Sequence, residues 1–438
     1  MGALAVHRLS DLAPADRRRI MERSASTIFS PQLVADVREL VEDVRERGDD
    51  AIVDALRRFD GVTCEAASLH VSPQELDEAR AAVGADLMAA IREGITNIRA
   101  FNERVVRDAD WVEELAPGHL VGEQTRPIDA AGLFVPSGKG SFPSVLMQIG
   151  TPAVVAGVPR IAVVVPPAPG TGGAIDPAVL VVAQELGLVD VFRANGPAGV
   201  AALAFGTASV PRVSRVVGPG SPAVAAAQIE VQRHGCSTVM LLGPTESVII
   251  ADDTADPRIV AADLLNEAEH GADSAALLLT PSRQLVSAVD GEIDVQLRRL
   301  PAPRREFAES AISQLGGAII VRDLDEAAGF ASEYAPEHVM IATEEPESLL
   351  PKIEHAGEIL LGSTPFSAAN YVIGVPAALP TGGFARQSSG VNARTFLKTS
   401  SVARTSAEAL GRLAPSVRAL AEHEGFPAHE AALRERGL

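Results

Sequence analysis

The sequence contains little cysteine and few aromatic side chains. In 438 residues there are 2 cysteines, 1 tryptophan and 2 tyrosines, and aromatic residues make up only 4% of the chain. The cysteines, Cys64 and Cys236, lie far apart and form no Cys-x-x-Cys pair, so neither a disulfide framework nor a thiolate zinc site is expected. A small disulfide-stapled module is therefore excluded.

Basic residues and long apolar runs are also scarce. Lys and Arg total 38 against 57 Asp and Glu, which gives a formal net charge of −19. Such a charge repels phosphate backbones and anionic lipid, so we expect neither nucleic acid nor a membrane as a partner. The N-terminus has no apolar run long enough for a signal peptide, and the most apolar stretch, Thr151 to Pro167, is broken by prolines and Arg160. These features predict a cytoplasmic protein.

From about residue 130 the sequence alternates short β-branched runs with helical patterns. Several predicted helices start with an Asp N-cap followed by Pro, as at Asp176-Pro177 and Asp256-Pro257, and one strand is predicted near Thr238 to Leu242. Strands that are almost entirely apolar are typical of parallel sheets covered by helices on both faces, so we predict an α/β protein with two doubly wound sheets. The first 120 residues are predicted to be mostly helical, and the polar tail from Thr399 to be helical without strands.

One predicted helix, from Pro257 to about His270, carries a Glu and a His three positions apart. Glu267 and His270 therefore lie on one face, one turn apart, which is the spacing at which helices present metal ligands. Glu-x-x-His also recurs by chance. For this pair alone, the alternative is a solvated helix end with His270 near the C-terminal dipole.

A second segment, Tyr334 to His338, places a carboxylate beside an imidazole just before a predicted strand. Glu337 and His338 are side chains of the kind that act as general acid and base near neutral pH. Neighbours on a strand point to opposite faces, so both can serve one site only from the loop at the mouth of the strand, where Pro336 stiffens the approach. A surface Glu and a capping His are the alternative.

A third segment, Gly218 to Ala223, follows a predicted strand and opens a predicted helix. It matches the G-x-G-x-x-G/A pattern, in which backbone amides at a helix N-terminus hold a phosphate. No acidic residue stands about 20 positions on to bind a ribose hydroxyl, so a bare tight turn stays open as an alternative. His429, in the polar C-terminal region, is by itself a surface histidine.

Taken together, the motifs of this chain resemble the histidinol dehydrogenase family in order and in spacing. They are GLFVPSG, GPGS, GPTESVIIADDTADP, DLLNEAEHG, YAPEHV, LPTGGFAR with its following SSG, and EGFPAH. The resemblance extends from about residue 30 to about residue 430. It implies two incomplete Rossmann-like domains with a helical N-terminal segment and a helical C-terminal tail, in an intertwined homodimer whose active sites take residues from both chains.

The resemblance implies a division of the chain into four parts. Residues 1–30 form an N-terminal segment, residues 31–128 and 245–390 form a larger discontinuous α/β domain, and residues 129–244 form a second Rossmann-like domain that binds nucleotide. Residues 391–438 form a tail that reaches the partner subunit.

The resemblance also implies one Zn²⁺ per subunit. By motif its ligands are Glu267, His270, Asn370 and His429, where the family has Gln in place of Glu267 and Asp in place of Asn370. The two exchanges are complementary, because an oxygen ligand remains at each place and the formal charge of the set is unchanged. Zn²⁺ accepts carboxylate oxygen together with imidazole nitrogen, so we expect a metal site to persist.

The catalytic pair of the family falls on Glu337, expected to activate water in a second oxidation, and His338, expected to take the hydroxyl proton in the first. Thr245 and Glu424 fall on substrate contacts. Pro376-Ala377 replaces an Asn-His pair of the family, which removes an imidazole expected to contact the substrate.

The predicted NAD site departs further from the family pattern. Phe134, Ala198 and Ser221 stand where the family has Tyr, Gln and Asn as nucleotide contacts. Each lost hydrogen bond costs about 0.5 to 1.5 kcal/mol, so together the exchanges weaken NAD by about one to three decades or change its pose.

These observations favour a zinc-dependent, NAD-linked dehydrogenase that oxidises a small polar primary alcohol to an aldehyde, with a further oxidation to the carboxylate left open. Because the polar contacts have changed, we expect an alcohol other than histidinol. A genuine L-histidinol dehydrogenase is the first alternative. A metal-binding protein that kept the scaffold and lost hydride transfer is the second.

Overall fold

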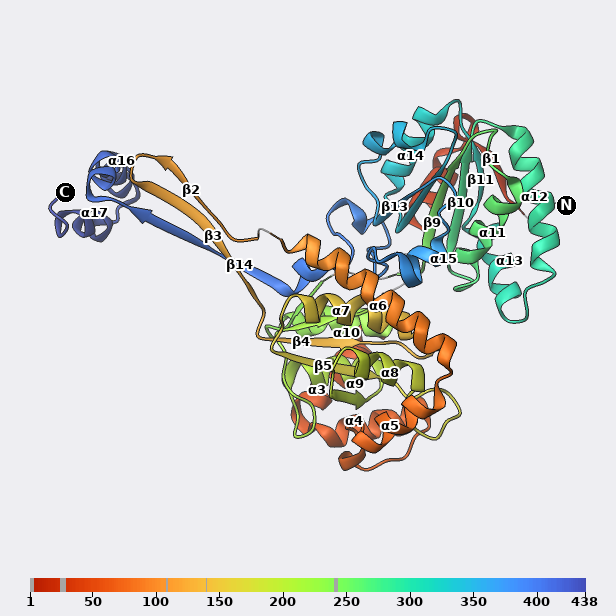
Figure 1. Ribbon diagram of the computed structural model, residues 1–438, viewed down its shortest axis with the longest axis horizontal. Coiled ribbons are helices and arrows are strands. Elements are labelled where there is room, and N and C mark those ends of the chain that lie inside the picture. Colours follow the sequence, from red (N-terminus) through yellow and green to blue (C-terminus); the bar gives the residue numbers. More distant parts are fainter. Residues whose placement is uncertain (1–3, 24–28, 108, 139, 240–242) are drawn as a thin grey trace.

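The computed structural model describes residues 4–23, 29–107, 109–138, 140–239 and 243–438, which form two parallel sheets and an extended arm (Figure 1). The six-stranded sheet has the order β1-β11-β10-β9-β12-β13, with every pair of neighbours parallel. All residues of β9 and β10 are buried, as expected for strands covered on both faces. The strands are β1 (Val6–Arg8), β9 (Glu246–Ala251), β10 (Ala275–Thr280), β11 (Gly317–Ile320), β12 (His338–Ala342) and β13 (Glu358–Leu361).

Helices cover both faces of the six-stranded sheet. On one face lie α11 (Pro257–Ala268), α12 (Arg283–Leu297) and α13 (Arg304–Gln314), and on the other lie α1 (Pro14–Glu22) and α14 (Leu324–Tyr334). The predicted start of α11 is confirmed, since the Asp256 carboxylate accepts the Arg258 N–H at 2.8 Å.

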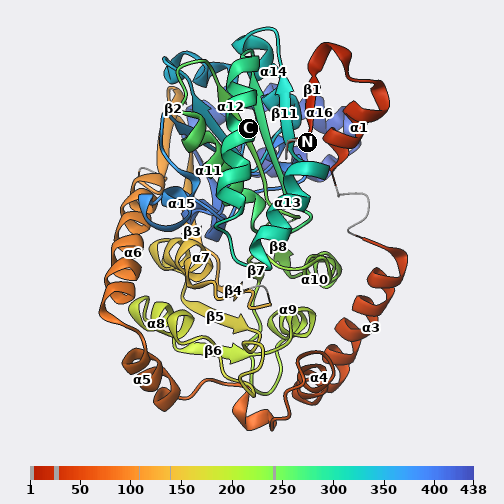
Figure 2. The ribbon, with the colours of Figure 1, turned by 90° about the vertical axis from the view of Figure 1, so that its right-hand side faces the viewer.

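The five-stranded sheet is also entirely parallel, with the order β6-β5-β4-β7-β8. Its strands are β4 (Ala130–Phe134), β5 (Arg160–Val165), β6 (Asp190–Arg193), β7 (Arg215–Val217) and β8 (Ser237–Thr238). One face is covered by α5 (Pro73–Ala82), α6 (Ala85–Val105), α7 (Pro143–Val155) and α8 (Pro177–Glu185), and the other by α3 (Pro31–Arg47), α4 (Asp49–Ala55), α9 (Gly196–Phe205) and α10 (Pro222–Gln232). Figure 2 shows the two sheets, each with its helices, one above the other.

The arm consists of an antiparallel sheet and two helices that extend away from both parallel sheets (Figure 1). Its strands are β2 (Trp111–Ala116), β3 (His119–Pro127) and β14 (Leu397–Thr405), and its helices are α16 (Ala407–Glu424) and α17 (Pro427–Arg434). Every residue of β2 and eight of the nine residues of β14 are exposed. The arm therefore has little core of its own.

The prediction of two parallel sheets covered by helices is confirmed, but the tail was wrongly predicted to lack strands. The sequence LKTSSVART of β14 has no alternation of apolar residues, and the strand is formed by backbone pairing with β3 along its whole length. The N-terminal 120 residues also contain β1 and β2. In the strand predicted near Thr238 to Leu242, β8 ends at Thr238, and residues 240–242 lie outside the described residues.

The packing also contradicts the grouping of residues 31–128 with 245–390. Helix α3 packs on α9 and α10, α5 on α8, and α6 on α7, so these helices belong to the five-stranded sheet. An apolar helix face such as that of Val37, Val41 and Val44 shows that a helix is buried but not against which sheet. Phe396 is buried in the same body, so the arm leaves it at β14 rather than at residue 391.

Among the described residues, no helix is both long enough and apolar enough to span a membrane.

Candidate active site

The catalytic pair predicted from the sequence lies where the strands of the six-stranded sheet begin. Glu246, His338 and Glu358 are the first residues of the adjacent strands β9, β12 and β13, and His338 is in register with Ser247 and with Glu358. Because parallel strands start at the same side of a sheet, their first residues form one edge, which we call the amino edge. All three side chains are buried there.

His338 is surrounded by carboxylates. Its Nδ1 lies 2.6 Å from Glu358 Oε1, and its Nε2 lies 3.6 Å from Glu337 Oε1 and 3.9 Å from Glu267 Oε2. Burial lowers the pKa of His338, but the charges of Glu337 and Glu267 and the hydrogen bonds to Glu337 and Glu358 raise it further, so that it stands well above its ordinary value. The imidazole is held at Nδ1, and Nε2 is directed at the other two carboxylates.

The predicted metal pair is close enough in space to share an ion. Glu267 Oε2 lies 3.8 Å from His270 Nδ1, and this oxygen is buried without a hydrogen-bond partner in the described part of the chain. The other oxygen, Oε1, accepts from Asn266 Nδ2 at 2.6 Å. Helix α11 ends at Ala268, so His270 stands in the turn after the helix rather than on its face as predicted. Ligand atoms about 2 Å from Zn²⁺ stand at such separations, so this donor pair fits the metal.

The remaining predicted ligands are not brought together by one chain. Asn370 lies in the π-turn Ala369–Ile373 after α15 (Phe366–Ala368), which packs against α11. His429 is exposed on α17, and Glu424 is the last residue of α16, both at the far end of the arm (Figure 1). Accordingly, the described residues contain no cluster of three or more His, Cys, Asp or Glu side chains arranged for a metal.

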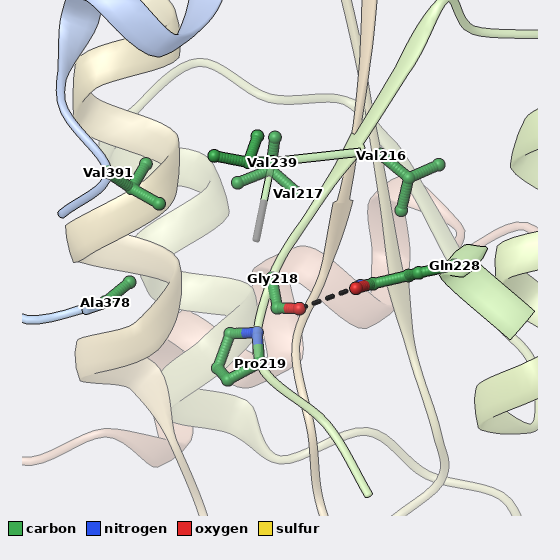
Figure 3. A pocket seen from close by; sticks show the side chains of 8 residues that line it. All are labelled: Val216, Val217, Gly218, Pro219, Gln228, Val239, Ala378 and Val391. Atoms are coloured by element: carbon green, nitrogen blue, oxygen red, sulfur yellow. Dashed lines mark hydrogen bonds between the residues drawn. The ribbon is translucent and has the colours of Figure 1, made fainter. Parts of the chain in front are cut away.

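The glycine turn predicted to hold a phosphate follows β7 at the carboxyl edge of the five-stranded sheet. Gly218 has φ +145°, and a Cβ there would lie 2.0 Å from the Phe134 carbonyl oxygen, so the position requires glycine. Gln228 Nε2 donates to the Gly218 carbonyl at 2.9 Å, beside a small pocket that Ala378 and Val391 also line (Figure 3).

Of the three predicted nucleotide contacts, only Ser221 is exposed. It is the N-cap of α10, and its Oγ accepts the Val224 N–H at 3.4 Å. Phe134 and Ala198 are 2% and 0% exposed and belong to the core beneath the turn. The sequence pattern predicted the tight turn after β7, but it could not show that Phe134 on β4 and Ala198 on α9 point into the core.

One segment joins the two edges. Ala378 lines the pocket beside Gly218, and four residues later the Gly382 N–H donates to Glu246 Oε1 at 2.8 Å. Four steps of 3.8 Å limit the distance between the Cα atoms of Ala378 and Gly382 to about 15 Å. The glycine turn and the His338 cluster are therefore near each other.

Over almost its whole length the chain is similar to proteins of one family. The family model described as histidinol dehydrogenase matches residues 23–437. A histidinol dehydrogenase from Synechocystis sp. is 40% identical over 431 residues, 98% of each chain, and a histidinol dehydrogenase homolog from Colwellia psychrerythraea is 38% identical over 97% of this chain and 94% of its own. The crystal structure of histidinol dehydrogenase from Elizabethkingia anophelis superposes with a TM-score of 0.93 at 30% identity, covering 100% of this chain and 98% of that one.

The chain belongs to the histidinol dehydrogenase family. The family predicted from the motifs is thereby confirmed, and so is the predicted enzyme class, an oxidoreductase that acts on CH–OH groups.

Two features of this histidinol dehydrogenase family site were missed by the sequence reasoning. Glu358 holds His338 Nδ1 but stands 20 positions away, and its one signal is an acidic residue opening an apolar strand. Arg23 pairs with Glu246 from a distant part of the chain and has no sequence signal of its own. Thr245, a predicted substrate contact, is half-buried directly before β9.

Proposed function

We propose that this chain oxidises L-histidinol with NAD as the hydride acceptor. The observation that carries the proposal is the buried Glu337–His338 pair, held at the amino edge between Glu358 and Glu267, in a chain 40% identical to a relative named histidinol dehydrogenase. An alcohol oxidation needs a base for the hydroxyl proton and an acceptor for the hydride. His338 is the base and NAD is the acceptor.

In the first oxidation the substrate hydroxyl would give its proton to His338 Nε2 as a hydride leaves the carbinol carbon, which yields the aldehyde; NAD, when bound, would supply the hydride acceptor. Glu358, bound to Nδ1, orients the ring and stabilises the proton that it gains. In the second oxidation Glu337 would take a proton from the water that adds to the aldehyde, while the aldehyde oxygen takes back the proton held by His338. The resulting hydrate would give a hydroxyl proton to His338 as its hydride leaves for the acceptor, which yields the carboxylic acid. Glu337 Oε2 accepts the Glu246 N–H at 3.3 Å, which fixes the direction of that carboxylate.

Glu267, His270 and Asn370 of one chain would hold Zn²⁺ together with His429 of a second copy of the chain. Bound there, the ion would polarise the alcohol oxygen and lower the pKa of its hydroxyl. The charge of Glu267 raises the pKa of His338, so neutralisation of that charge by a cation favours the neutral imidazole that accepts a proton. NAD would place its phosphates at the Gly218 turn and the first amides of α10.

The arm supports a homodimer in which Glu424 and His429 reach the other subunit's site. Its strands and helices expose apolar side chains that have no core to cover them, and a patch of this kind marks a protein interface. These are Trp111, Val112, Leu115, Val402, Leu413, Leu420 and Phe426.

A mixing experiment tests this shared site. His338→Ala and His429→Ala are each expected to be inactive alone, whereas coexpression should restore about a quarter of wild-type activity, because half of the dimers then contain one intact site. No recovery in isolated heterodimers contradicts a site built from two chains.

The test of the proposed function is NAD reduction by zinc-loaded protein with L-histidinol as the only alcohol, beside the His338→Ala variant. We expect histidinol-dependent turnover that the variant lacks. No turnover by protein that binds both zinc and NAD contradicts histidinol as the substrate. Absence of NAD binding itself instead supports a metal-binding protein without hydride transfer.

One observation favours a second candidate, another small polar primary alcohol. Pro376-Ala377 has no polar side chain where the family has Asn-His, and the Ala377 N–H donates to Gln148 Oε1 at 3.2 Å. A site that loses a polar contact loses discrimination for the substrate group that used it. This candidate is supported if kcat/KM is higher for such an alcohol than for L-histidinol.

A further inference from the structure

A buried arginine from the N-terminal segment reaches the catalytic segment. The Arg23 side chain is 7% exposed, and its Nε lies 2.5 Å from Oε2 of Glu246, whose side chain is 3% exposed. Its Nη2 donates to the Tyr334 carbonyl oxygen, and its guanidinium lies 3.6 Å from the centre of the Tyr334 ring. Arg23 is therefore bound both to Glu246, at the start of β9, and to Tyr334, which precedes Glu337 in the chain.

Each residue that Arg23 contacts is in turn connected to Glu337, one by a hydrogen bond and the other along the backbone. Glu246, held by Arg23 and by the Gly382 N–H, donates its own N–H to Glu337 Oε2 at 3.3 Å. Tyr334, held at its carbonyl oxygen and ring, ends α14 three residues before Glu337. The hydrogen bond from Glu246 restrains the Glu337 carboxylate, and the contacts to Tyr334 restrain the backbone that leads to Glu337.

Backbone strain marks the same place. In the described part of the chain the non-glycine residues with positive φ are Arg23, at φ +54°, and Ala335, at φ +50°. Such conformations cost free energy and persist only where surrounding contacts enforce them. Both belong to this one cluster, because Ala335 directly follows the residue that Arg23 holds.

We propose that Arg23 is a positioning residue of the reaction, which acts through Glu246 and the Tyr334 carbonyl to hold Glu337 against His338. The proposal rests on the proposed function. It assigns to the N-terminal segment a part in the chemistry, although within the described residues no hydrogen bond or ion pair joins Arg23 directly to Glu337 or His338. Burial raises the pKa of Glu246 to about 7, and the charge of Arg23 opposes this shift.

Steady-state kinetics of Arg23→Met tests the proposal, with Arg17→Met as the matched control. Arg17 lies on α1, pairs with Glu333 on the same helix α14 and stacks on Phe330, but does not touch Glu246 or the Tyr334 carbonyl. We expect Arg23→Met to lower kcat by about 10- to 100-fold with little change in KM, and Arg17→Met to leave both near wild type. Arg23→Lys keeps the charge but not the planar fork, so its kcat should be intermediate.

A double-mutant cycle shows whether Arg23 acts through Glu246. Glu246→Gln should lower kcat as well, and Arg23→Met/Glu246→Gln should fall no further than the worse single variant, because both changes cut one path. A wild-type kcat in folded Arg23→Met, or additive losses in the double variant, overturns the proposal.

Hydrogen exchange separates failure of this proposal from failure of the proposed function. Arg23→Met, but not Arg17→Met, should lose protection in the peptide that spans Tyr334 to His338, whether or not L-histidinol is oxidised. Unchanged protection in that peptide contradicts the positioning role. An inactive wild-type protein with the expected loss of protection contradicts only the substrate.

Discussion

The two parallel sheets of this chain are built alike but carry their polar groups at opposite edges. In the six-stranded sheet, Glu246, His338 and Glu358 stand at the first positions of β9, β12 and β13. In the five-stranded sheet, the Gly218 turn and the N-terminus of α10 follow the last residues of β7. Ligands of open α/β sheets bind at the carboxyl edge, so the nucleotide site that we propose on the five-stranded sheet follows that rule and the His338 cluster of the six-stranded sheet does not.

The difference follows from the helix ends available at each edge. Helices that follow strands start at the carboxyl edge, and their free N–H groups favour anions such as phosphates. They end at the amino edge, where free carbonyl groups favour cations. Glu267 and His270 stand at the C-terminal end of α11, beside the His338 imidazole. A metal ion, and a base that gains a proton during the reaction, suit the amino edge for the same reason that a nucleotide suits the carboxyl edge.

The largest expected effect of breaking this division comes from His338→Ala at the amino edge. Without a proton acceptor, kcat should fall by about 10²- to 10⁴-fold. The metal content should stay at the wild-type value, because His338 is not among the proposed ligands. Full activity in the variant contradicts its role as the base, and metal analysis of the same sample provides the control.

The next largest effect is expected from Glu267→Ala. Removal of one of the proposed ligands should lower Zn²⁺ affinity by at least about 10- to 100-fold, measured by metal competition. Glu269→Ala is the matched control, since Glu269 caps the same helix but is not a proposed ligand. Equal Zn²⁺ affinity in both variants contradicts the metal site.

At the carboxyl edge, Gly218→Ala should weaken NAD binding and lower the free energy of unfolding by more than about 1 kcal/mol. Its Cβ would meet the Phe134 carbonyl oxygen at 2.0 Å. Gly157→Ala is the control, because Gly157 also has positive φ, at +76°, but nothing lies within 4 Å of the added Cβ. Equal NAD affinity and equal free energy of unfolding in the two variants would contradict the claim that the close contact at Gly218 requires glycine.

The smallest expected effect is on the pH dependence of stability. Burial raises the pKa of Glu246 to about 7 in the folded chain from an ordinary 4.5, so the folded state binds this proton more tightly than the unfolded state. The contribution of Glu246 to stability is therefore full below pH 4.5 and is lost as the pH rises to about 7. Denaturant unfolding of wild type and Glu246→Gln should show a smaller fall with pH in the variant. If the free energy of unfolding falls equally with pH in both proteins, the pKa of Glu246 is not raised in the folded state.

Both acidic motifs could be predicted from the sequence, but their proximity in space could not. Glu267-x-x-His270 and Glu337-His338 were recognisable because helix spacing and neighbouring residues are local properties. That Glu267 Oε2 lies 3.9 Å from His338 Nε2 depends on which strands are neighbours, and nothing local in the chain encodes this. Glu358 and Arg23 were missed for the same reason.

The fold was predictable to a similar extent. All-apolar strands such as β9 and β10 indicated parallel sheets, and the Asp256-Pro257 cap indicated the start of α11. Strand β14 was not predictable, because an exposed strand held by backbone hydrogen bonds to β3 needs no pattern of side chains. The partner of α3 was not predictable either, since an apolar stripe fits either sheet.

The division of work between the two edges is tested most directly by titrating NAD into zinc-loaded His338→Ala and measuring turnover with L-histidinol in the same preparation. The account predicts an NAD affinity equal to that of the wild type together with loss of turnover, because the proposed nucleotide site and the base lie on different sheets. An NAD affinity that falls along with turnover would contradict it.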